Sequence, residues 1–137
     1  TFLMIAEENN IQDFDVEQAV ERKRAFVDKN LDKITLVKHV MEVIEAFKGK
    51  LPMAVGTGSN RKTVDHMFDM HELGKYFEHV VTATEVSNHK PHPETFLKCA
   101  ELINIDPKDC LVFEDGKPGM QAAETAGMEV VDITLFE

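Results

Sequence analysis

The most informative part of the chain is Cys110-Leu111-Val112-Phe113-Glu114-Asp115-Gly116. It is a short apolar run that ends in two adjacent carboxylates and a glycine, as a buried parallel strand does where it leaves a sheet. Neighbouring carboxylates at the rim of a packed sheet repel each other unless a positive charge lies beside them. The run therefore predicts a Mg²⁺ site with Glu114 and Asp115 as ligands, and the alternative is a capping pair for a helix that begins near Pro118.

Around this run, apolar strand patterns alternate with helical patterns. Such alternation predicts an α/β fold with a doubly wound, parallel, Rossmann-like sheet whose functional edge lies at the carboxyl ends of the strands. The expected strands are 53–55, 79–83, 111–113 and 130–133, and the expected helices are 61–70, 94–103 and 120–126.

The first third of the chain is expected to be helical without strands. An apolar face is formed by Phe2, Leu3, Ile5 and Ala6, and Asp15 can cap a second helix. The Asp13-Phe14-Asp15 spacing resembles a phosphate-transferring aspartate pair, but a polar segment precedes it, so helix capping is the favoured interpretation. A third helix is expected to end at Gly49.

Composition indicates one α/β domain, with or without a small appendage, and excludes some classes of partner. The 137 residues are 43% hydrophobic, which is enough to close one core, and no apolar run has the length of a membrane span. The net charge of −10 argues against nucleic acid as a partner. The only cysteines, Cys99 and Cys110, predict a reducing, cytoplasmic setting. Because the chain starts inside a helical pattern, we expect it to be a fragment of a longer protein.

Two loops carry polar groups that suit phosphate. Gly56-Thr57-Gly58-Ser59-Asn60 leads from a strand into a helix, which favours either anion binding or a turn capped by Ser59 or Asn60. The run through Thr63 nearly matches a nucleotide-binding P-loop, but Arg61 replaces the second glycine. Lys90 lies in a second loop whose two prolines restrict its shape, which suits an ammonium aimed at one point.

Taken together, Thr57, Lys90 and Glu114-Asp115 resemble the second, third and fourth motifs of the haloacid dehalogenase (HAD) superfamily of phosphohydrolases and phosphomutases. The resemblance runs from about Leu36 to the C-terminus. The β-phosphoglucomutase and sugar-phosphatase branch is the most similar, especially small fructose-1-phosphatase-like enzymes. The segments that carry this likeness are 53–59, 89–91, 112–115, 119–123 and 126–128.

This resemblance implies a Mg²⁺-dependent phosphatase that acts on a small phosphorylated sugar through an aspartyl-phosphate. By carry-over, Thr57 and Lys90 are catalytic, both bind phosphate together with Gly58, and Asp115 and Glu114 bind the metal. Residues 1–34 are expected to be part of an α-helical cap, and residues 35–137 an incomplete HAD core.

The family's first motif, Asp-x-Asp-Gly-Thr after an apolar strand, is absent from these residues. It carries the nucleophile and the central first strand, so we expect the chain alone to be inactive and to pair with another chain or segment at an exposed sheet edge. The alternatives are a β-phosphoglucomutase-like phosphomutase, a noncatalytic phosphate-binding or interaction module, and a P-loop nucleotide-binding domain.

Overall fold

The computed structural model describes residues 6–136, and the chain forms two compact units, Thr1–Ile34 and Thr35–Glu137. Within the described residues, no helix combines the length and the apolar character needed to cross a membrane.

The first unit consists of helices joined by turns, without a strand, among its described residues 6–34. Residues 6–8 are helical, α2 spans Val16–Lys29, and a 3₁₀ turn follows at Leu31–Lys33. Asp15 is the N-cap of α2, and its carboxylate accepts a hydrogen bond of 2.9 Å from the N–H of Gln18, which confirms the predicted cap. The expected helical face on Phe2, Leu3 and Ile5 lies outside the described residues.

The second unit alternates strands and helices, which confirms the expected α/β class. Along the chain its helices and strands are α3 (Lys38–Phe47), β1 (Ala54–Gly56), α4 (Arg61–His71), β2 (His79–Val81), α5 (Glu94–Ile103), β3 (Leu111–Glu114), α6 (Lys117–Thr125) and β4 (Glu129–Asp132). Short 3₁₀ turns lie at Leu73–Lys75, Pro107–Asp109 and Ile133–Phe136.

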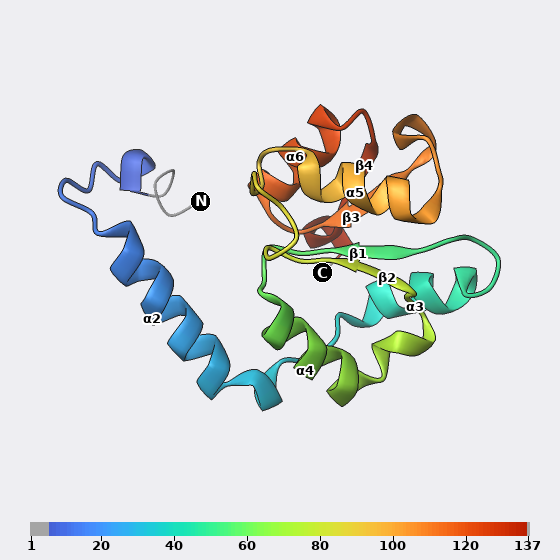
Figure 1. Cartoon of the computed structure of the whole chain (residues 1–137), viewed down its shortest axis with the longest axis horizontal. Coiled ribbons are helices and arrows are strands. Elements are labelled where there is room, and N and C mark those ends of the chain that lie inside the picture. The colour runs from blue at the N-terminus through green and yellow to red at the C-terminus, as the bar shows by residue number, and fades with distance from the viewer. Residues whose placement is uncertain (1–5, 137) are drawn as a thin grey trace. The chain divides into compact units, whose positions relative to one another are not determined.

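The strands form two parallel pairs rather than one continuous sheet. In the first pair Val55 of β1 is in register with Val80 of β2, and in the second Val112 of β3 is in register with Val130 of β4. Figure 1 shows α5 and α6 on one side of β1 and β2, with α3 and α4 on the other. In the described part of the chain, β1 and β3 are each hydrogen-bonded to one neighbouring strand only.

The core lies where α5 and α6 pack on the strands. Its buried cluster contains Phe96, Ala100, Ala122, Ala123 and Met128. The alanines let the two helices approach closely, and burying a side chain as large as Phe96 contributes roughly 1.5–3 kcal/mol. This packing fixes α5, and with it the end of the loop that carries Lys90.

Several element boundaries differ from the sequence-based expectation, and two of these differences have a clear structural reason. β2 ends at Val81 rather than at residue 83, because the backbone and side chain of Thr82 turn to hydrogen-bond Glu85. α6 begins at Lys117 rather than at residue 120. Pro118 and Gly119 look like helix breakers in the sequence, but proline is compatible with the first turn of a helix, where its missing N–H costs nothing.

Candidate functional site

Lys90 joins the carboxyl ends of two strands that are not paired with each other. Its ammonium donates to the carbonyl oxygen of Gly56 at the end of β1 (3.2 Å) and to Oε2 of Glu114 at the end of β3 (2.7 Å). It also lies 4.2 Å from the centre of the Phe96 ring, a cation–π contact. The Lys90 and Glu114 side chains are each 15% exposed. A largely desolvated ion pair therefore marks this edge of the fold.

Glu114 is held by contacts on both of its carboxylate oxygens. While Oε2 faces Lys90, Oε1 accepts hydrogen bonds from the N–H groups of Asp115 (3.3 Å) and Gly116 (3.2 Å). The side chain also lies against Gly119, where an added Cβ would be 2.1 Å from Cδ of Glu114. The N-cap of α6 is Gly116, without a side-chain capping bond, so Glu114 and Asp115 do not cap this helix as the alternative interpretation required.

The loop after β1 places Thr57 next to the Lys90 contact. The Thr57 N–H donates to Val81 (2.9 Å), and its hydroxyl oxygen accepts from the N–H of Ser59 (3.1 Å). Gly58 is exposed, and a Cβ at this position would meet nothing within 4 Å. The structure thus brings Thr57, Gly58, Lys90 and Glu114 to one end of the strands, with Asp115 exposed beside Glu114.

Two N–H groups at the end of the same loop, where a nucleotide cradle would need them free, already have hydrogen-bond partners. Asn60 is the N-cap of α4 and accepts from the N–H of Thr63 (2.9 Å), so the sequence-based turn with Asn60 as its cap is confirmed. The N–H of Arg61 donates to the Thr84 hydroxyl (3.3 Å). Lys62 is exposed on α4. Because these N–H groups already have partners, the P-loop interpretation loses its physical basis.

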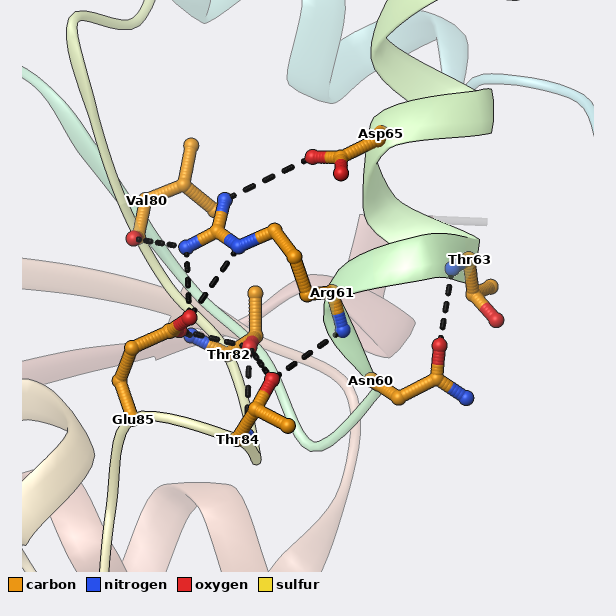
Figure 2. Close-up of polar contacts among 8 residues, drawn as sticks. All are labelled: Asn60, Arg61, Thr63, Asp65, Val80, Thr82, Thr84 and Glu85. Carbon is orange, nitrogen blue, oxygen red and sulfur yellow. Dashed lines mark hydrogen bonds and ion pairs between the residues drawn. The ribbon is translucent and has the colours of Figure 1, made fainter.

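A polar network beside this loop was not anticipated from the sequence (Figure 2). Arg61 pairs with Glu85, and the hydrogen bonds from the Thr82 hydroxyl and N–H, together with Arg61, lower the pKa of Glu85 below its usual value. In the sequence, Arg61 is notable only because it replaces the second glycine of a P-loop motif. Its pairing with a residue 24 positions away depends on the register of β1 with β2, which no local pattern reports.

The acidic pair fits part of a Mg²⁺ site. Mg²⁺ usually keeps several waters and takes one or two protein carboxylates together with substrate phosphate, which an exposed Asp115 beside Glu114 can supply. Within residues 6–136, no group of three or more His, Cys, Asp or Glu side chains is placed to hold a metal ion. Water molecules and substrate phosphate could fill the remaining ligand positions.

The two cysteines do not provide a nucleophile. Cys99 is buried against β1, and burial raises the pKa of its thiol to about 11. Burial also raises the pKa of Cys110, as do the nearby carboxylates of Asp109 and Asp106. Both thiols are therefore protonated near neutral pH and are poor nucleophiles.

Two curated proteins with sequences similar to this chain are both named as phosphatases. Fructose-1-phosphate phosphatase YqaB of Escherichia coli (strain K12) is 39% identical over 119 residues, which cover 87% of this chain and 61% of that protein. The phosphorylated carbohydrates phosphatase of Thermotoga maritima is 32% identical, covering 88% of this chain and 55% of that protein. The chain therefore spans roughly three fifths of the length of these curated relatives.

Solved structures agree on the fold. A HAD-superfamily hydrolase of subfamily IA from Geobacter sulfurreducens superposes with a TM-score of 0.69 at 29% identity, over 74% of this chain and 52% of that one. A β-phosphoglucomutase from Clostridium difficile superposes with a TM-score of 0.70 at 24% identity, over 92% and 59%, and supports the fold alone. The family model for haloacid dehalogenase-like hydrolases matches residues 2–133. The chain belongs to the haloacid dehalogenase-like hydrolase family.

Proposed function

We propose that the natural protein containing this chain is a Mg²⁺-dependent phosphatase that hydrolyses a small phosphorylated sugar through an aspartyl-phosphate intermediate. The observation that carries the proposal is the Lys90 ammonium, which lies between Gly56 of β1 and Glu114 of β3. The relatives named for fructose-1-phosphate and phosphorylated carbohydrates support the substrate class.

The arrangement of the strands supports a nucleophile supplied by a further segment. Among residues 6–136, β1 and β3 each have one hydrogen-bonded neighbouring strand, and Lys90 links their carboxyl ends. A parallel strand hydrogen-bonded to both β1 and β3 would end beside Lys90, Thr57 and Glu114. An aspartate at the end of that strand would be positioned to attack phosphorus, and residues 1–34 would then be part of an α-helical cap.

Each of the site residues described above has a role in the proposed reaction. The Thr57 hydroxyl and the Gly58 N–H bind phosphate oxygens, and the Lys90 ammonium neutralises the nucleophile and the transferring phosphate. Asp115 and Glu114 hold Mg²⁺, which when bound offsets charge on the phosphoryl group. Glu114 also fixes Lys90, so one carboxylate orients the cation and contributes to the metal site.

The test is phosphate release by the full-length natural protein from a panel of sugar phosphates, with Mg²⁺ or with EDTA. We expect activity only with Mg²⁺, a loss of about 100-fold or more in Asp115→Asn, and a loss of about 10²- to 10³-fold in Lys90→Ala. Asp69→Asn and Lys62→Ala, which change exposed residues of α4, are the matched controls. Full activity in EDTA or in Asp115→Asn would refute the metal assignment, and full activity in Lys90→Ala would refute the role of the lysine.

A further inference from the structure

The loop that carries Thr57 is bound to the segment that follows β2. The N–H of Thr57 donates to the Val81 carbonyl (2.9 Å), and the N–H of Ala83 donates to the Ser59 carbonyl (2.9 Å). These bonds extend the contact between β1 and β2 past the ends of both strands. The segment after β2 continues to Lys90, so the positions of Thr57 and Lys90 depend on the same junction.

One ion pair closes this junction at the start of α4 (Figure 2). The Arg61 side chain donates to Oε1 of Glu85 from Nε (3.1 Å) and pairs with the same oxygen through Nη2 (3.0 Å). Nη2 also donates to the Val80 carbonyl of β2 (3.1 Å). The guanidinium therefore contacts both the strand β2 and the segment that leaves it. Asp65, one turn along α4, lies farther away, at 3.7 Å from Nη1.

Glu85 in turn fixes the first turn of its own segment. Its Oε2 accepts hydrogen bonds from the N–H and the hydroxyl of Thr82, each at 2.6 Å. Thr82 is fully buried, and its hydroxyl lies 2.6 Å from that of Thr84, which accepts from the backbone N–H of Arg61. The two loops thus form one closed network of charged and neutral hydrogen bonds.

We infer that Arg61 and Glu85 are a positioning pair, which sets the spacing between the phosphate-binding loop at Thr57 and the loop that carries Lys90. This inference rests on the proposed function. The two side chains are 41% and 40% exposed, and an ion pair exposed to that degree adds little to global stability. Its larger effect is geometric, because Arg61 is only four residues after Thr57 and a misplacement of about 1 Å at a binding group can cost up to about 100-fold in rate.

The experiment measures KM, kcat and the competitive inhibition constant of inorganic phosphate in the full-length protein. For Arg61→Ala we expect KM and the inhibition constant to rise together by about tenfold and kcat to fall by up to about 100-fold, because the groups that bind and orient phosphate are moved rather than removed. Arg61→Lys should recover part of the affinity. In a double-mutant cycle, Glu85→Gln should add little to Arg61→Ala, since the two residues act as a unit. Asp65→Asn, which removes only the 3.7 Å contact, is the control and should bind phosphate normally.

The outcomes separate this inference from the proposed function. If Arg61→Ala lowers the unfolding midpoint but leaves KM and phosphate inhibition unchanged, the pair is purely structural and the inference is overturned. In that case, loss of activity in Thr57→Ala and Lys90→Ala would still support the proposed function. If Thr57→Ala and Lys90→Ala are both fully active, the proposed function fails and the inference fails with it. Additive effects of Arg61→Ala and Glu85→Gln would also overturn the positioning pair.

Discussion

Replacing Gly119 with alanine should drive a methyl group into the side chain of Glu114. The added Cβ would lie 2.1 Å from Cδ, 2.2 Å from Oε2 and 2.5 Å from Cγ of Glu114, whereas carbon atoms in contact are about 3.5–4.0 Å apart. Glu114 must therefore move by more than about 1 Å. Such a shift lengthens the 2.7 Å contact with Lys90 beyond hydrogen-bonding distance.

The expected loss of stability in Gly119→Ala depends on which contacts Glu114 and Lys90 lose and which they keep. Separating a buried ion pair costs about 3–5 kcal/mol when one partner is left with nothing, but Lys90 keeps the Gly56 carbonyl and the Phe96 ring. We therefore take the cost as that of overpacking, about 2 kcal/mol. Alanine regains up to about 1 kcal/mol of helix propensity in α6. The free energy of unfolding should thus fall by about 1 kcal/mol.

The assay compares urea unfolding and Mg²⁺-dependent phosphate release for Gly119→Ala and Gly74→Ala in the full-length protein. Gly74 is the matched control, because an added Cβ there meets nothing within 4 Å. We expect at least about a tenfold loss of turnover in Gly119→Ala, since Lys90 loses its orienting partner. In a Glu114→Ala background, Gly119→Ala should add no further destabilisation, because the clash is gone. Equal stability and full activity of the two glycine variants would refute the placement of Glu114.

Two further outcomes concern acid stability and the start of α4. The N–H of Ser87, then the Lys98 ammonium and the Asn88 N–H, lower the pKa of Glu94 from its ordinary value of 4.5 to about 2. The stabilisation from this carboxylate is present above pH 4.5 and is lost as the pH falls towards 2. Urea titrations should therefore show that Glu94→Gln is less stable than the wild type at pH 7 and equally stable near pH 2. A difference in stability that does not change with pH would contradict this prediction. Asn60→Ala should lower the free energy of unfolding by about 1 kcal/mol, because Asn60 caps α4, and an unchanged urea midpoint would show that the cap contributes nothing.

Much of the second unit could be predicted from local pattern. The position of strand β3 and the helix after Pro93 follow from apolar runs and helix periodicity, which are local properties. The expected burial of β3 is wrong on one face, because Leu111 and Phe113 are exposed among the described residues. The reason for a glycine at position 119 of α6 could not be predicted, because it is not local. Gly119 is tolerated in this helix because Glu114 occupies the space of its missing Cβ, and that contact exists only after β3 and α6 have packed.

The candidate site could likewise be predicted only in part from the sequence. Thr57, Lys90 and Glu114 follow strands or precede helices, so their position at one edge could be inferred from a parallel topology. The direction in which each side chain points could not be inferred from the sequence. That Glu114 faces Lys90, and that Arg61 faces a partner in the next loop, depends on tertiary packing and on strand register.

The segment that delivers Lys90 is fixed by carboxylates at both of its ends. Glu85 accepts from Thr82 at the start, and Glu94 accepts from the backbone near the end. Lys98 joins the two ends, since its ammonium lies 2.5 Å from the Glu85 carbonyl and 3.0 Å from the Glu94 carboxylate. These contacts lie outside the apolar core of α5 and α6. The position of the Lys90 ammonium therefore depends on these surface contacts as well as on its buried pair with Glu114, so charge substitutions or acid should loosen this end of the fold before the core unfolds.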